Sequence, residues 1–302
     1  MGVSAVTVQK HLKELCAGGY IKKIGSRPFV RYRFVRHLPP PTIKSSIIDD
    51  HFLFVDSFGS VYTDTEAFRI WSKHNLKKLS LEEKVQRYEQ CIREMKAQKR
   101  NGVYTLNEKW EDFQKKTDED IFMREMVCAA PYALPDFGRT KEATLLGIAK
   151  DGGKNSVMYM NQLVERFVPP LLTYLRHLQP EAVVFIPPTA ERKVQLMDVI
   201  KKRFREISEL PVITVRKRYR DVARQQKHLS DIRDRVQNAN ETFFPDETDR
   251  QYRSVLLIDD MVGSGASFNQ VAKKLVTRNI AKEIYGIGIV GDRRGFTAVK
   301  KM

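Results

Sequence analysis

Residues 254–275, SVLLIDDMVGSGASFNQVAKKL, constrain the fold of this chain more than any other stretch. A short apolar run leads into two adjacent carboxylates, Asp259 and Asp260, and then through a glycine and serine loop into a helical pattern. A continuous apolar strand followed directly by a helix is typical of a parallel sheet that helices cover on both faces. Ligands of such sheets bind outside the carboxyl ends of the strands, so we expect a site at the two aspartates.

The sequence repeats this alternation of strand and helix from about residue 143 onward. Further short apolar runs predict strands at 182–186, 212–215 and 284–290. Helices are predicted at 156–178, 190–207 and 267–278. Pro169 and Pro170 predict an interruption of the first of them, since proline lacks the N–H that a helix interior uses. The predicted fold class is α/β, with a doubly wound parallel sheet.

The first 38 residues have a different pattern, a short helix followed by a basic hairpin. Val8, Leu12 and Leu15 are spaced as one face of a helix, and Gly18 and Gly19 end it. Two strand-like pieces follow, YIKKI and FVRYRFV, joined by the turn GSRP. This arrangement resembles the recognition helix and wing of bacterial winged helix-turn-helix repressors. We therefore expect a partial winged helix over 1–38, an α+β segment that a protein partner completes.

The resemblance implies that this segment contacts nucleic acid, either DNA or an RNA–DNA hybrid. In that family the helix would face the major groove and the wing would meet phosphates, which assigns Thr7, Gln9, Lys10, Lys13, Arg27, Arg31 and Arg33. The charge distribution agrees, because residues 1–46 carry nine Lys or Arg and one acidic residue. Residues 47–180 are balanced, and 181–302 carry a second net charge of +8. Two separate basic regions favour anionic partners.

A proline-rich linker at 39–46 separates this segment from the rest of the chain. Residues 47–130 are expected to form an α+β connecting region without recognisable chemistry. It contains a predicted hairpin around 57–60 and a helix that Ser80 caps, with Glu83 completing a capping box. Residues 131–302 are expected to form the α/β domain.

The composition argues against several classes of protein. No apolar run is long enough to span a bilayer, and the amino terminus lacks the apolar core of a signal peptide. We therefore expect no membrane partner and a cytoplasmic location. The three cysteines lie far apart, and the six histidines form no HxxxH or HxH pattern, which argues against a zinc site or a disulfide framework.

The double aspartate needs a ligand with two kinds of group. A strand that passes through a Gly/Ser loop into a helix presents backbone N–H groups and a positive helix end to an anion. Two carboxylates would repel that anion unless they accept hydrogen bonds from hydroxyls of the same ligand or hold a divalent ion. A phosphate at one end and a vicinal diol nearby describe a ribose 5-phosphate.

The stretch VLLIDDMVGSGAS closely resembles the motif of type I phosphoribosyltransferases that binds 5-phosphoribosyl 1-diphosphate (PRPP). The resemblance implies that Asp259 and Asp260 are catalytic and bind the ribose 2- and 3-hydroxyls. The loop that would wrap the 5-phosphate is Gly263, Ser264, Gly265, Ala266 and Ser267. Gly263 departs from the family, which usually has a hydroxyl or another small side chain there. Mg²⁺ would arrive with PRPP and have no direct protein ligand.

Other segments resemble the ComF-like branch of these enzymes. The stretch RQQKHLSDIRDRVQNANETF, 224–243, and the stretch GIAKDGGKNS, 147–156, are similar to that branch. The resemblance implies a diphosphate loop after strand 182–186, made of Thr189, Ala190, Glu191, Arg192 and Lys193. It also implies a hood over the diphosphate, made of Arg216, Lys217, Arg218, Arg224 and Gln226. The basic run 216–224 could instead contact nucleic acid.

Three interpretations of function stay open at this point. The first is an enzyme that transfers or releases a phosphoribosyl group. The second is a winged-helix transcriptional regulator that senses PRPP without turning it over, which the unusual Pro187 and Pro188 before the diphosphate loop favour. The third is the accessory effector, a toxin, of a bacterial retron anti-phage system, which would bind a reverse transcriptase and its RNA–DNA product.

Overall fold

The computed structural model describes residues 5–25, 30–35, 43–151, 153, 155–188, 192–218 and 231–292. The chain divides into two compact units, Met1–Lys44 and Ser45–Met302, and each is described by itself. Across the described ranges, no helix combines the length and the apolar character that crossing a membrane requires.

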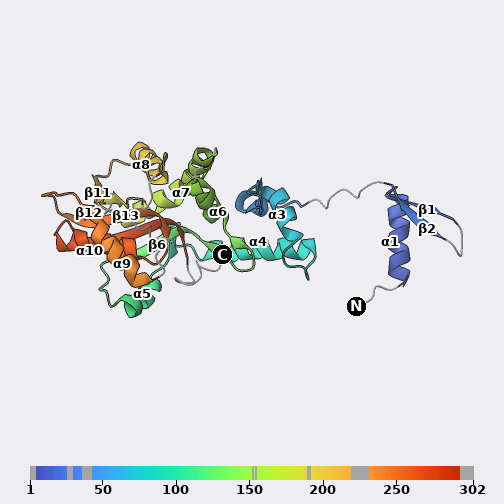
Figure 1. The fold of residues 1–302 in the computed structure, drawn as a ribbon, viewed down its shortest axis with the longest axis horizontal. Coiled ribbons are helices and arrows are strands. Elements are labelled where there is room, and N and C mark those ends of the chain that lie inside the picture. The colour runs from blue at the N-terminus through green and yellow to red at the C-terminus, as the bar shows by residue number, and fades with distance from the viewer. Residues whose placement is uncertain are drawn as a thin grey trace. The chain divides into compact units, whose positions relative to one another are not determined.

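The first unit consists of α1 (Ala5–Ala17) and a two-stranded hairpin, as Figure 1 shows. Strand β1 (Ile21–Ile24) pairs antiparallel with β2 (Arg31–Phe34), from Ile21 opposite Phe34 to Ile24 opposite Arg31. The helix and hairpin expected from the sequence are therefore confirmed. Of the side chains described in this unit, none is buried. The unit thus has no core of its own within the described residues.

The second unit is built on a six-stranded sheet with the order β10-β9-β13-β14-β6-β5. The parallel strands are β6 (Glu125–Pro131), β9 (Ala182–Phe185), β10 (Val212–Ile213), β13 (Tyr252–Val262) and β14 (Ala281–Gly291). Only β5 (Tyr104–Thr105), at one edge, pairs antiparallel with its neighbour. The chain is therefore a mixed α/β protein with a mostly parallel sheet, as its apolar strands predict.

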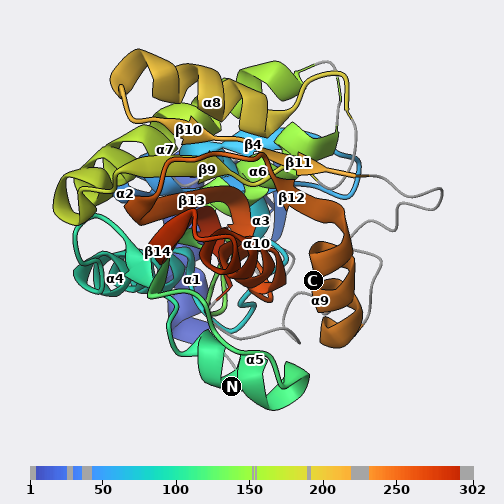
Figure 2. The same ribbon diagram turned by 90° about the vertical axis from the view of Figure 1, so that its left-hand side faces the viewer.

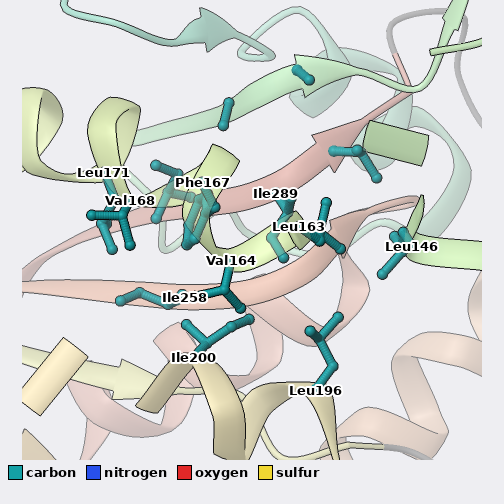
Figure 3. Close-up of a cluster of buried hydrophobic side chains, with 14 of the residues drawn as sticks. Leu146, Leu163, Val164, Phe167, Val168, Leu171, Leu196, Ile200, Ile258 and Ile289 are labelled. Carbon is teal, nitrogen blue, oxygen red and sulfur yellow. The ribbon is translucent and has the colours of Figure 1, made fainter. Parts of the chain in front are cut away.

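Helices cover both faces of this sheet (Figure 2). One face carries α6 (Lys141–Asp151), α7 (Ser156–Leu178) and α8 (Leu196–Ile207), and the other carries α5 (Lys109–Thr117), α9 (Ile232–Thr242) and α10 (Ala266–Thr277). Leu256 and Ile258 of β13 belong to the first buried cluster, part of which Figure 3 shows, and Val255 and Leu257 belong to the second. Because side chains alternate along a strand, an unbroken apolar run fills both layers.

The stretch expected as a connecting region is part of this unit. It contains α2 (Ser46–His51), β3 (Leu53–Val55), β4 (Val61–Thr63), α3 (Asp64–Ser72) and α4 (Leu81–Ala97). The predicted hairpin and the Ser80–Glu83 capping box are both confirmed. Phe52, Phe68 and Tyr88 form an aromatic cluster with Phe137, so this stretch packs on the α/β layers. The division expected at 130 falls inside β6, since β5 and β6 extend the sheet.

Short antiparallel ribbons complete the unit. They are β7 (Ala133–Leu134) with β8 (Gly138–Arg139), and β11 (Val215–Lys217) with β12 (Phe243–Pro245). The predicted strand 212–215 is thus divided between β10 and β11. The basic segment 216–250, for which no helix was predicted, contains α9.

Two expectations about the extent of helices are wrong. Helix α7 continues through Pro169 and Pro170 because it buries apolar side chains on both sides of them, including Phe167 and Leu171. Tertiary packing here outweighs the cost of two missing N–H donors. Helix α8 begins at Leu196 rather than near 190.

Candidate functional site

The strands β9 and β13 lie next to each other at the point where the chain reverses its direction across the sheet. From β9 the chain crosses through α8 to β10 on one side, and from β13 it crosses through α10 to β14 on the other. The two connections diverge after Ile186, whose N–H donates to the carbonyl of Ile258 at 2.9 Å. Such a switch point opens a crevice at the carboxyl ends of the strands, where α/β proteins bind ligands.

The two aspartates lie within β13 and not beyond its end. Asp259 still pairs with Gly288 of β14, because β13 keeps this neighbour after β9 has ended at Phe185. The side chain of Asp260 is 17% exposed, and its Oδ1 accepts a hydrogen bond from Lys150 Nζ at 2.7 Å. Lys150 belongs to the last turn of α6 and brings a cation to the carboxyl end of β13.

The pKa of Asp259 lies well above its usual value. Burial of the carboxyl group is the main cause, and the neighbouring Asp260 carboxylate adds to it. The cation of Lys150 and the backbone N–H of Asp260, which donates to Asp259 Oδ1 at 2.7 Å, act in the opposite direction without cancelling the rise. A carboxyl group with a raised pKa next to a second carboxyl group is typical of a functional site.

The loop 263–267 forms a tight turn between β13 and α10. Gly265 has a φ of 84°, and a Cβ on it would lie 2.8 Å from Cζ3 of Trp110. The buried Lys109 donates from Nζ to the carbonyl of Gly263 at 2.9 Å. The N–H of Ala266 donates to Ser264 Oγ at 3.4 Å, and the first turn of α10, which includes Ser267, has further N–H groups that no intrahelical carbonyl can satisfy. The turn therefore presents donors and a positive helix end to an anion.

Part of the expected diphosphate loop meets this site. Thr189, Ala190 and Glu191 lie outside the described residues, whereas Arg192 and Lys193 are described. Arg192 Nε donates to the backbone carbonyl of Lys150 at 2.9 Å, so it lies beside the Lys150–Asp260 pair. Lys193 is exposed.

Three of the expected hood residues lie on or next to strand β11. Arg216 forms an ion pair with Asp246 at 2.8 Å. Burial lowers the pKa of Lys217 to about 8. The guanidinium of Arg218 lies 4.9 Å from the ring centre of Phe244. These residues are held on the β11–β12 ribbon, and Arg224 and Gln226 lie outside the described residues.

The expected nucleic-acid residues that the structure describes are all exposed. Gln9, Lys10 and Lys13 belong to α1, and Arg31 and Arg33 belong to β2. Lys22 of β1 is the direct cross-strand partner of Arg33. Two like charges in that position destabilise a hairpin, so an anionic ligand would relieve the repulsion. The side chain of Thr7 and all of Arg27 lie outside the described residues.

Sequence reasoning missed two features of this edge of the sheet. Lys150 lies in the quoted stretch 147–156, but only the fold brings it to Asp260. Asp292 comes directly after the apolar strand β14, just as Asp259 comes directly after the apolar run of β13. The backbone N–H of Asp292 donates to the carbonyl of Val262 at 3.2 Å. Asp292 also lines a cavity of about 360 Å³ with Glu94 and Glu108 at the carboxyl ends of β6 and β14. The sequence signal that could have identified Asp292 is a carboxylate at the end of an apolar run.

The donor set at this edge fits a ligand that brings its own metal ion. Among the residues that the structure describes, no group of three or more His, Cys, Asp or Glu side chains could hold a metal ion. Asp259 and Asp260 are two adjacent carboxyl groups, and one of them carries a raised pKa that an approaching cation would lower. A divalent ion that reaches the site within a ligand is therefore compatible with these residues.

Known proteins add nothing to this description. Comparison of the chain with protein-family models, with curated proteins and with solved structures finds no match.

Proposed function

We propose that the Ser45–Met302 unit binds PRPP and Mg²⁺ at the carboxyl end of β13, as a phosphoribosyltransferase-like domain of the ComF-like branch. The observation that carries the proposal is the turn at Gly265. This turn connects β13 to α10 and follows Asp259 and Asp260 closely in the chain. A phosphate fits the N–H donors of this turn, and ribose hydroxyls fit the carboxylates as donors to Asp259 and Asp260.

Charges on neighbouring segments support the remaining contacts. Asp260 accepts the bond from Lys150 Nζ at one carboxylate oxygen, and its other oxygen can accept from a ligand hydroxyl. Burial and the neighbouring Asp260 disfavour the ionised form of Asp259. Ligand hydroxyls or the ligand's Mg²⁺ stabilise this form when they approach. Arg192 lies next to Lys150 and supplies a guanidinium for the diphosphate, with Lys193 as a second cation.

The same residues support transfer chemistry. The bond between C1 and the diphosphate oxygen breaks, the diphosphate leaves with the electron pair, and a nucleophile forms the new bond to C1. Positive charge develops on the ribose as the diphosphate departs, and Asp259 and Asp260 stabilise it by electrostatics. Arg192 and Lys193 neutralise charge on the leaving group. A sensor would use the binding contacts alone, so the site is common to both interpretations.

The proposal is tested by PRPP binding and by pyrophosphate release in the presence of Mg²⁺. We expect PRPP to bind the wild type, and Asp259→Asn/Asp260→Asn to lose binding. A matched control is Asp234→Asn/Asp249→Asn, which removes the same charge from two exposed positions. Release that depends on both aspartates identifies a transferase or hydrolase, and binding without release identifies a sensor. Binding that the Asp259→Asn/Asp260→Asn variant retains would contradict the proposed site.

A second function, nucleic-acid binding by the Met1–Lys44 unit, is favoured by the pair of Lys22 and Arg33. These side chains lie directly opposite each other, and Arg31 lies two residues from Arg33 on the same face of β2. Phosphates would neutralise this face of the hairpin, while Lys10 and Lys13 lie one turn apart on α1.

Filter binding to duplex DNA, to an RNA–DNA hybrid and to single strands over a series of salt concentrations tests this function. We expect binding that weakens with salt and that Arg31→Gln/Arg33→Gln reduces about tenfold or more. Duplex binding that PRPP modulates would favour the regulator, and preference for the hybrid would favour the retron effector. Binding that is insensitive to salt, or unchanged in this variant, would contradict the assignment.

A further inference from the structure

A cavity of about 210 Å³ opens to the surface of the Ser45–Met302 unit, between α4, the α6–α7 layer and strands β6 and β14, and the side chains of Lys96 and Lys99 in its lining are exposed. Its polar lining consists of His51, Lys96, Lys99, Tyr104, Glu142 and Arg166. None of these residues belongs to the site at the carboxyl end of β13. The cavity is therefore a separate feature, which nothing in the proposed function uses.

The cations of this lining exceed what its acids can neutralise. Arg166 is satisfied within the protein, because it donates to Glu142 at 2.7 Å and to Asp50 at 3.0 Å. Lys96 belongs to the last turn of α4, and Lys99 lies just beyond the helix, where its backbone N–H donates to the carbonyl of Lys96 at 3.1 Å. Within the part of the chain that the structure describes, neither ammonium group has an ion-pair partner. Two positive charges thus face a cavity whose one lining carboxylate is already engaged.

The neighbouring groups show that these positive charges are close to one another. Burial lowers the pKa of Lys99, and the cations of Lys96 and Arg166 lower it further, against the opposing effect of Glu142. Burial also lowers the pKa of His51, and Lys96 is the next cause. His51 is therefore neutral near pH 7, and the lining keeps a surplus of positive charge without it.

The remaining side chains that line the cavity are apolar. Met95 of α4, Phe167 and Pro170 of α7 and Ile289 of β14 line the cavity, and Figure 3 shows Phe167 and Ile289 within the buried cluster. Lys99 Nζ lies 5.2 Å from the ring centre of Tyr104. A volume of about 210 Å³ corresponds to about seven waters at the liquid volume of about 30 Å³ each. This size suits a small metabolite.

We propose that this cavity is a second anion site, which binds the phosphate group of a small phosphomonoester at Lys96 of α4 and at Lys99, which follows the helix. The phosphate meets the two ammonium groups, and the carbon skeleton of the ligand lies against Met95 and Phe167. Inorganic phosphate shares the charged half of this chemistry without the apolar half.

The test uses the full chain and follows the rate at which acetic anhydride modifies individual lysines, read by mass spectrometry. We expect glycerol 3-phosphate to slow the labelling of Lys96 and Lys99 at least threefold at saturation. The exposed Lys77 and Lys78, at which nothing is expected to bind, should label at an unchanged rate and serve as the internal control. Inorganic phosphate should protect the same two lysines at higher concentration, and glycerol should not protect them.

Two variants separate this site from the PRPP site. Asp259→Asn/Asp260→Asn should leave the protection of Lys96 and Lys99 unchanged, even though it abolishes PRPP binding. Calorimetric binding of glycerol 3-phosphate should weaken at least tenfold in Lys96→Gln/Lys99→Gln and not in Lys77→Gln/Lys78→Gln. Protection of all four lysines alike, protection by glycerol, or no saturable protection would overturn the proposal.

Discussion

The chain leaves the adjacent strands β9 and β13 in two very different ways. After β13 it needs only residues 263–265 before α10 begins, and Gly265 is held against Trp110. After β9 it takes the stretch 186–195 to reach α8, and Arg192 is attached there through the backbone of Lys150. One side of the crevice is therefore fixed by packing against a buried side chain, and on the other side the described contact of Arg192 is a hydrogen bond of a half-buried side chain.

This difference bears on what each side can do. A turn that is ordered before the ligand arrives loses little conformational entropy when it binds a phosphate. The start of α10 is further fixed by Asn269, which donates to the carbonyl of Asp120 and accepts from the N–H of Phe122. Under the proposed function, the longer connection after β9 carries Arg192 and Lys193, which would contact the diphosphate. The phosphate contacts of the proposed function thus lie on the β13 side of the crevice, and the diphosphate contacts lie on the β9 side.

The largest effect is expected for Gly265→Val. A side chain at a φ of 84° costs about 1–3 kcal/mol of strain, and its Cβ would meet Trp110 at 2.8 Å, which adds about 1–3 kcal/mol of overpacking. We expect urea unfolding to show a loss of about 2–6 kcal/mol in unfolding free energy. The matched control is Gly263→Val, in the same loop, where a Cβ has nothing within 4 Å. Equal losses in the two variants would mean that the turn is not fixed by Trp110.

The next largest effect is expected at Asp259, where order on the β13 side places two carboxyl groups together. A carboxyl group whose pKa is raised by folding favours the folded state below its unfolded pKa, and this stabilisation is lost as pH rises through the folded value. Asp259→Asn removes the ionisable group, so the variant does not lose this stability as the pH rises. We expect the variant to unfold at a higher temperature than the wild type at pH 8, by a margin that shrinks as the pH falls toward 4.

Asp56, in the β3–β4 turn, provides the control with the opposite sign. It accepts hydrogen bonds from the backbone N–H groups of Ser60 and Phe58, which lower its pKa. Its contribution to stability is present above the unfolded pKa and is lost as pH falls through the folded value. Asp56→Asn should therefore lower the unfolding temperature at pH 8. A rise in both variants would show that the gain at position 259 reflects lost charge in general.

The same two connections show how far the sequence alone reaches. The apolar run at 254–258 predicted the central strand, the loop and α10, because each depends on residues close in sequence. The extension of β13 through Asp259 to Val262 could not be predicted, since it arises from pairing with β14. Lys150 was missed for the same reason, because the hydrogen bond to Asp260 joins residues 110 positions apart.

The connecting region shows the same limit. Ser80 and Glu83 predicted the start of α4 correctly, because a capping box is a local signal. Nothing local indicated that β5 and β6 would extend the sheet beside β14. The prolines of α7 are the opposite case, because there a local signal was misleading. They predicted an interruption of the helix, but burial of Phe167 and Leu171 keeps it continuous.

The smallest effect on stability, together with a clear effect on binding, is expected for Arg192→Gln on the β9 side. Its one described hydrogen bond, to the carbonyl of Lys150, belongs to a partly exposed connection, so the unfolding free energy should change by about 0.5 kcal/mol or less. Loss of a charged contact with the diphosphate should weaken PRPP binding by about tenfold or more, measured by calorimetry with Mg²⁺.

Arg205→Gln, which removes an exposed arginine from α8, is the matched control and should change neither quantity. If Arg192→Gln destabilised the fold as much as Gly265→Val does, the two connections would be equally fixed by packing, and the comparison would fail. If it changed neither stability nor PRPP binding, Arg192 would lie outside the site, and the diphosphate would have to be held from the β11–β12 ribbon instead. A loss of binding at unchanged stability is the result that separates a phosphate turn whose packing stabilises the fold from a diphosphate side whose residues serve binding alone.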